Sequence, residues 1–219
     1  MALSKLTFDS INVTPAASKA IRFNSNANGF ETASAGGSLT LIKTQTISSG
    51  TGTVSFVNGT SDVVLDDTYK EYIFFFNSIH GSANADPLFN FSIDTGSNYN
   101  VTKTTTTFAA NHAEGDGEAA LGYIASTDLA QSTAFQSYNY DLDSGGDSCY
   151  SGYLHLFEPS STTFVKHFIM VNNGVKDDIQ SSVFYVAGYG NTTSAVDAIQ
   201  FKMASGNIDA GTISLYGVL

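Results

Sequence analysis

Apolar and polar residues alternate along most of this chain, in short segments separated by turns that contain glycine or asparagine. Residues two apart share one face of a sheet, whereas a helix repeats about every 3.6 residues. The alternation therefore predicts strands, and no amphipathic helix separates them as a parallel α/β fold requires. The predicted strands are 39–42, 54–56, 72–76, 88–93, 99–108, 152–157, 164–171, 183–189, 199–203 and 212–216. Many short strands of this kind predict an all-β protein, an antiparallel β-sandwich or jelly roll.

Three of these segments carry more specific expectations. Residues 72–76 are apolar at every position, which is typical of a central strand covered on both faces. Residues 99–108 are rich in threonine, which favours extended backbone and tolerates water, so we expect an exposed strand. The last two strands, 199–203 and 212–216, are expected to pair with each other as a hairpin.

Two regions interrupt the alternation. Residues 109–150 are rich in glycine and predict an irregular insertion, with a short strand at 119–124 and a brief helix at 128–135. Residues 1–37 contain Asn/Ser/Gly runs typical of flexible chain, and predict an N-terminal arm ahead of a domain at 38–219. This segment is either an extended arm that orders against a neighbouring subunit or an ordinary first strand with a loose lead-in.

Length and cysteine content limit the architecture further. A chain of 219 residues suits one all-β domain, and its core can be stable without disulfides or metal. Cys149 is the single cysteine, so no internal disulfide forms, and we expect synthesis and folding in a reducing cytosol. Neither a signal peptide nor an apolar run of about 20 residues is evident, so membrane insertion is not expected.

The charge content is low and acidic. Charged residues make up 13% of the chain, and the net charge is −11. Such a chain repels phosphate, so nucleic acid is not an expected partner. The acidic residues are scattered through loops, which favours solubility rather than a specific site. A surface rich in serine, threonine and asparagine suits contact with other protein surfaces.

Catalytic groups are hard to find. Nucleophilic catalysis needs an activated Ser, Thr or Cys beside a histidine, and the sequence has no Gly-x-Ser-x-Gly motif. The four histidines are His80, His112, His155 and His167. The spacing of His155 and His167 matches no short zinc motif, and Cys149 has no cysteine partner. We therefore expect neither an enzyme nor a catalytic or cofactor-binding residue.

One acidic loop is a candidate metal site. Asp141, Asp143 and Asp147 alternate with Ser144, Gly145 and Gly146, and such carboxylates can surround calcium, which takes six to eight oxygens. An EF-hand loop would carry glutamate at position 152, where this chain has glycine. The alternative is a solvated acidic loop that binds no metal, and no other cofactor is expected.

Tyrosines gather in the irregular region. Tyr138, Tyr140 and Tyr150 are candidate partner-binding residues, because a rigid ring offers a large contact area at little entropic cost. The alternative is that these rings cap the core of the sandwich.

Several segments resemble a known class of protein. They are Leu6–Pro15, Leu41–Thr46, Lys70–Phe76 and Ser205–Val218, and the most specific is the C-terminal Gly-x-Ile-x-x-Gly-Thr-Ile-x-Leu-Tyr-Gly. Together they are similar to small virion structural proteins of tailed bacteriophages, marine ones especially. The resemblance implies a jelly-roll sandwich that assembles on the particle as a capsid decoration, fibre, knob or tail component. The resemblance assigns no functional residue to this chain.

The expected function is thus that of a non-enzymatic virion structural protein. Expected partners are further copies of the chain, as a homotrimer or another homo-oligomer, and other virion proteins bound through the N-terminal arm. The alternative is a host receptor- or carbohydrate-binding module of a phage fibre or spike, with the loop at 109–150 as its binding surface. A polysaccharide depolymerase ranks third, because no fixed carboxylate pair is evident.

Overall fold

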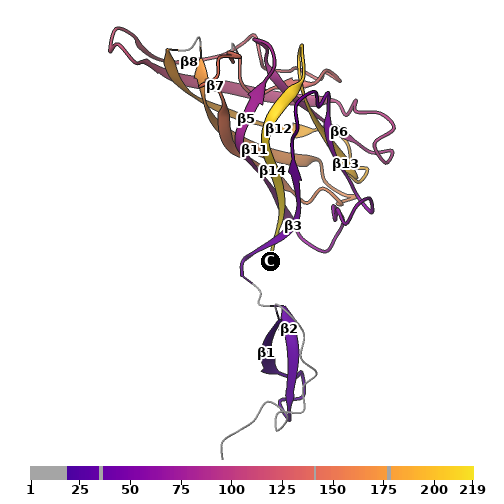
Figure 1. Cartoon of the computed structure of the whole chain (residues 1–219). Helices are drawn as coiled ribbons and strands as arrows, with labels where there is room; N and C mark the ends of the chain where they lie inside the picture. The colour runs from indigo at the N-terminus through magenta and orange to yellow at the C-terminus, as the bar shows by residue number, and fades with distance from the viewer. Residues whose placement is uncertain (1–18, 35–36, 141, 177–178) are drawn as a thin grey trace, which may run out of the picture. The chain divides into compact units, whose positions relative to one another are not determined.

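A computed structural model describes residues 19–34, 37–140, 142–176 and 179–219, and every regular element in these ranges is a β-strand (Figure 1). The chain forms two compact units, Met1–Thr40 and Leu41–Leu219. The all-β prediction is confirmed.

Two antiparallel sheets face each other in the larger unit, as the sandwich prediction requires. The large sheet has eight strands, in the order β3 (Leu39–Thr46), β14 (Ile208–Val218), β5 (Glu71–Gly81), β10 (Tyr150–Phe157), β11 (Lys166–Lys176), β12 (Gln180–Gly190), β7 (Lys103–Ala113) and β8 (Ala119–Tyr123). The small sheet has four, in the order β4 (Val54–Val57), β13 (Ala198–Met203), β6 (Pro87–Ser92) and β9 (Gln136–Ser137). In Figure 1, β6 and β13 lie on one side of β14 and β5.

Phenylalanine rings fill the space between the two sheets. Phe201 on β13 lies at the centre, with its ring centroid 5.2 to 6.4 Å from those of Phe56, Phe74, Phe76 and Phe89. All five side chains are buried. The two sheets thus share one continuous apolar layer, and burial of these rings is the main contribution to stability.

The predicted C-terminal hairpin is wrong. Strand β13 pairs with β4 and β6 in the small sheet, whereas β14 pairs with β5 in the large one. The chain therefore crosses between sheets after Met203 instead of folding back on the same sheet. Alternation within each strand is equally compatible with either connection, so only packing across the core decides between them.

Strand β7 differs from the exposed threonine-rich strand that was predicted. Its alternate residues Lys103, Thr105 and Thr107 are buried, while Phe108 lies on the exposed face. The loop between β8 and β10 covers the buried side. There the Thr105 hydroxyl donates a hydrogen bond of 2.7 Å to Gln136 Oε1.

The predicted helix at 128–135 is also wrong. Backbone groups of this segment bond to β7 instead of to one another. The Ser132 amide and the Lys103 carbonyl are 3.0 Å apart, the reverse pair is 2.8 Å apart, and the Leu129 amide donates to the Thr105 hydroxyl. The short strand predicted at 119–124 is confirmed as β8, and residues 109–113 continue β7 instead of opening the insertion.

The smaller unit contains a hairpin of β1 (Lys19–Phe23) and β2 (Phe30–Ser34). The rings of Phe23 and Phe30 stack at 5.0 Å, and Arg22 pairs with Glu31 at 2.9 Å. The Asn/Gly run between them, predicted as flexible chain, is the turn of this hairpin. Residues 1–18 of the predicted arm lie outside the described residues.

Replacing the central ring is expected to destabilise the sandwich strongly. Phe201→Ala removes a ring that contacts four others, so the free energy of unfolding should fall by about 3 to 5 kcal/mol. The control Phe164→Ala alters a ring that is 66% exposed and should cost less than about 0.5 kcal/mol. Urea unfolding of both variants measures the difference, and equal losses would contradict the central role of Phe201.

Candidate interaction surface

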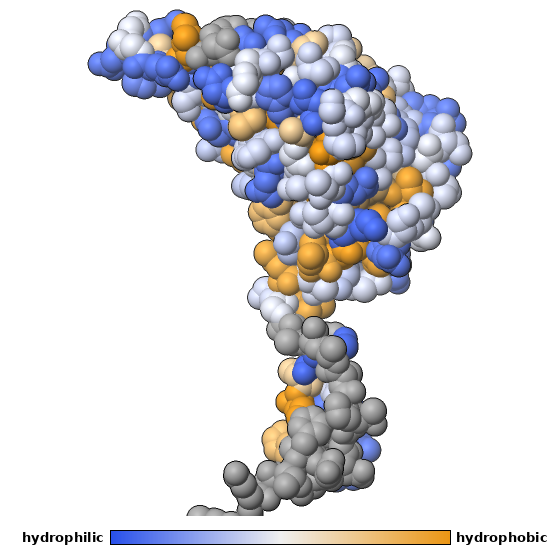
Figure 2. All heavy atoms as spheres, in the orientation of Figure 1, coloured by the Kyte–Doolittle hydropathy of each residue, from blue (hydrophilic) through white to orange (hydrophobic). Residues whose placement is uncertain are grey.

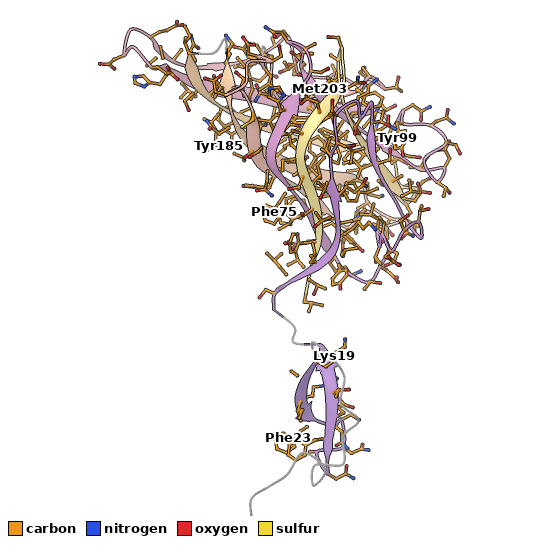
Figure 3. The ribbon with its side chains drawn as sticks, viewed as in Figure 1. Lys19, Phe23, Phe75, Tyr99, Tyr185 and Met203 are labelled. Atoms are coloured by element: carbon orange, nitrogen blue, oxygen red, sulfur yellow. The ribbon has the colours of Figure 1, made fainter. Side chains whose placement is uncertain are left out.

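The outer face of the large sheet, the side turned away from β6 and β13, is the most unusual surface of the described chain. Because side chains alternate along a strand, burial of Phe74, Leu154 and Val186 turns their neighbours to this side. Phe75 and Tyr185 are two such neighbours, and both lie on the side opposite the small sheet (Figure 3).

Strand register aligns the outer residues in rows across the sheet. The central row runs over seven strands, since each residue is the direct partner of the next, in the order Ser214, Phe75, Tyr153, Val171, Tyr185, Phe108 and Tyr123. The row beside it consists of Tyr216, Ile73, His155, Ile169, Ala187 and Thr106. Direct cross-strand partners are close enough for their side chains to touch.

Ring contacts join neighbouring strands in these rows. The rings of Phe108 and Tyr185 stack at 4.7 Å with an angle of 8° between their planes. Phe75 packs edge-on against Tyr216 at 5.5 Å and lies 6.4 Å from Tyr153. The outer face is therefore an ordered aromatic surface and not a scatter of single side chains.

These apolar groups are open to solvent. Phe108 is 42% exposed, Ile169 46% and Leu121 on the edge strand β8 74%. Antiparallel sheets with one face in water usually carry polar residues on that face. In the space-filling view, apolar residues also reach the surface at the lower ends of β3 and β14 (Figure 2).

Formal charge is nearly missing from the outer face. Among the described residues of β5, β7, β8, β10, β11, β12 and β14, the outward positions carry two carboxylates, Glu71 and Asp209, and neither lysine nor arginine. Asp209 lies at the end of the sheet, where it pairs with His80. Glu71 accepts from His155 Nε2 at 2.8 Å, and this imidazole stacks on Phe157. The acidic charge of the chain is therefore carried by other surfaces.

A shallow groove of about 410 Å³ opens on the same face. It lies over Ala187 and Gly188, whose small size leaves a hollow between the rings of Phe157, His167 and Tyr189. Threonine side chains of β7 complete the wall. The groove is thus mainly apolar, with aromatic rings at its sides.

The predicted partner-binding tyrosines do not lie on this face. Tyr138 and Tyr150 are buried, and their hydroxyls bond to each other at 2.7 Å. Burial raises the pKa of both phenols above the usual range. These two rings therefore pack in the core of the sandwich, as the alternative to partner binding predicts. Tyr140 is half-buried, packs edge-on against Phe184, and lies under Lys176 Nζ at 5.1 Å, so its role in binding stays a prediction.

The acidic loop is organised by its own backbone. Asp143 Oδ1 accepts hydrogen bonds from the Ser144 and Gly145 amides at 2.5 and 3.1 Å. His80 bridges the loop to β14, with Nδ1 2.7 Å from Asp209 and Nε2 2.9 Å from the Gly145 carbonyl, and these two contacts raise the pKa of His80. Asp141 lies outside the described residues, which contain no group of three or more His, Cys, Asp or Glu able to hold a metal. The calcium hypothesis stays a prediction.

A buried lysine is the strongest electrostatic anomaly. Lys103 is fully buried, and its Nζ donates to Asn90 Oδ1 and, at 2.8 Å, to the Val101 carbonyl. Burial lowers the pKa of this ammonium from its ordinary 10.5 to about 7. Such shifts are common at active sites, but this amine lies inside the sandwich and not at the groove, which favours a structural role.

The Lys103 pKa predicts a pH-dependent stability. Between pH 7 and about 10, the unfolded lysine binds a proton that the folded one does not, so stability should rise with pH by up to about 1.4 kcal/mol per unit. Lys103→Met should remove this rise, whereas Lys70→Met, at an exposed position, should keep it. Urea unfolding at pH 7, 8 and 9 tests both variants. An unchanged slope in Lys103→Met would contradict the shifted pKa.

Sequence reasoning missed the outer face, although its signal is present in the printed sequence. Strands such as 72–76 carry apolar residues on both faces, a pattern that by itself predicts that both faces are covered. Within the larger unit only the inner face is covered by a second sheet.

No protein-family model, curated protein or solved structure matches this chain. In the described ranges, no helix is long and apolar enough to cross a membrane.

Proposed function

We propose that this protein is a non-enzymatic structural subunit of a tailed-bacteriophage virion, made in the bacterial cytoplasm and assembled on the particle with copies of itself. The observation that carries the proposal is the apolar, nearly uncharged outer face of the large sheet. Exposed apolar patches of this extent mark sites of protein interaction. The C-terminal motif around Gly211 to Gly217 carries the resemblance to capsid decoration, fibre, knob or tail components of phage particles.

The surroundings of the histidines support a non-enzymatic role. Both nitrogens of His80 are engaged, by Asp209 and by the Gly145 carbonyl, so neither is free to accept a proton from a nucleophile. His155 contacts Glu71, and His112 contacts Asp116. These pairs join an imidazole to a carboxylate without a serine, threonine or cysteine hydroxyl or thiol as third member.

The β1–β2 hairpin supports attachment to other virion proteins. Ile21, Phe23 and Phe30 on this hairpin are exposed. A two-stranded hairpin is only marginally stable in water by itself, so contact with a partner surface would stabilise it.

The structural role predicts self-association and presence in the particle. Light scattering on the purified full chain should give a small multiple of 23.1 kDa. Mass spectrometry of mature particles should detect the protein in stoichiometric amounts, and an image reconstruction should place it in symmetric density. A protein that stays monomeric and is missing from mature particles would refute the proposal.

A second candidate is a host receptor- or carbohydrate-binding module, favoured by the groove of about 410 Å³ between Phe157 and Tyr189. Aromatic rings offer flat apolar faces to a sugar ring, and threonine hydroxyls offer hydrogen bonds. Tyr138 and Tyr150 are too deeply buried for this role.

Glycan binding would depend on the ring of Tyr189. On a glycan array, Tyr189→Ala should reduce a specific signal by about tenfold or more, while Tyr123→Ala, a ring outside the groove, should leave it unchanged. An array without any specific signal for the unaltered protein would remove carbohydrate binding as a candidate.

A further inference from the structure

The large sheet has the residue pattern of a sheet that is covered by protein on both of its faces. On β5, Tyr72, Phe74 and Phe76 enter the core, while Ile73 and Phe75 between them are also apolar and point outward. The same holds on β10, β11 and β12, where Tyr153, Ile169 and Tyr185 point outward. In the larger unit the small sheet covers only the inner side.

We propose that the outer face of the large sheet packs against the same face of a second copy of this chain, around a two-fold axis. The inference deepens the proposed structural function, on which it rests, by naming the assembly contact. A face that pairs with itself closes at two copies, so this contact forms a dimer in place of the expected trimer.

The size of the face fits a stable dimer. Adjacent strands lie about 4.8 Å apart, so the seven strands of the central row span about 30 Å. Four neighbouring rows, from Phe157 to Ser151 along β10, extend over about 20 Å. The projected area of roughly 600 Å², increased by the relief of the rings, approaches the 800 Å² or so that each partner buries in a standard interface.

Charge favours a second copy as the occupant. Each chain carries a net charge of −11, so two copies repel each other least when the contact surface carries few carboxylates and keeps the remaining ones apart. The outer face meets this condition, because its two carboxylates, Glu71 and Asp209, are each paired with a histidine, His155 and His80. A strongly basic partner would instead select for acidic residues on this face, which its outward positions lack apart from the histidine-paired Glu71 and Asp209.

The raised and hollow parts of the outer face also fit a contact with the same face of a second copy. Phe108 and Tyr185 form an exposed stack on one part of the face, and the groove beside Tyr189 lies on another. In a two-fold contact, residue i of one copy meets residue j of the other, and the reverse contact forms as well. The stack of each copy can therefore enter the groove of its partner, with the two sheets about 10 Å apart.

A carboxylate at the centre of the face should break the dimer. Ile169 is exposed, so Ile169→Glu should leave the fold intact, which circular dichroism checks. In the dimer this carboxylate would be desolvated beside His155, whose Nε2 already bonds to Glu71, and the dissociation constant should rise by about tenfold or more. Sedimentation velocity over a concentration series of the full chain measures the change.

Two adjacent residues on β8 provide a matched control. Leu121 belongs to the outer face, because it pairs with Ala110, whereas Ala120 next to it points to the opposite side. Both are exposed, so neither substitution should affect folding. Leu121→Glu should weaken the dimer and Ala120→Glu should not. Equal weakening by both would indicate pairing through the free edge of β8 and would overturn the face-to-face contact.

The outcomes separate this inference from the proposed function. A dimer that is weakened by Ile169→Glu and Leu121→Glu alone supports the contact. An oligomer that all three variants leave unchanged overturns it, while the structural function stands. A monomer that is nevertheless found in particles also overturns it and assigns the face to a different virion protein. A monomer that is missing from particles removes both proposals.

Discussion

The aromatic layer between the two sheets is the constraint on which the rest of the structure depends. Phe201 and the four rings around it must all point inward, and strand geometry then fixes the direction of every other side chain along the same strands. A slip of one residue in the pairing of β5 with its neighbours would bring Phe75 into the core and turn Phe74 into solvent. The register demanded by the core therefore also builds the outer row, with Phe75 beside Tyr153 and Phe108 beside Tyr185.

The unequal size of the sheets explains the polar part of the interior. Four strands cannot cover eight, so the inner side of β7 is covered by a loop, and a loop brings backbone amides and carbonyls that need partners. Thr105 and Gln136 supply hydrogen bonds to these groups, and Lys103 adds donors to Asn90 and Val101. The low pKa of Lys103 is the electrostatic consequence, because this amine lies where water does not reach.

Acidic charge and apolar surface occupy different parts of the molecule. Outward positions of the large sheet are mostly aromatic, aliphatic or hydroxyl-bearing, while carboxylates such as Asp116 and Asp147 lie in turns. A face with few charges, surrounded by charged turns, can be desolvated at low cost. This separation is the observation on which the proposed structural role rests, and the aromatic groove lies within the same surface.

Much of the fold follows from the sequence, because alternation is a local property of a strand. The strand at Phe89 and Phe91, the strand at Tyr72 to Phe76 and the short strand at 119–124 could all be located in this way. The candidate surface could not be predicted so directly, since Phe74 and Phe75 are equally apolar and nothing local says which of them enters the core. Membership of β13 and β14 in different sheets, burial of Thr105, and burial of Tyr138 against Tyr150 likewise depend on residues far away in the chain. The sequence by itself determined where the strands are and which residues share a face. Only the tertiary structure decided which face turns inward, because that choice is made by packing between segments that the chain brings together from a distance.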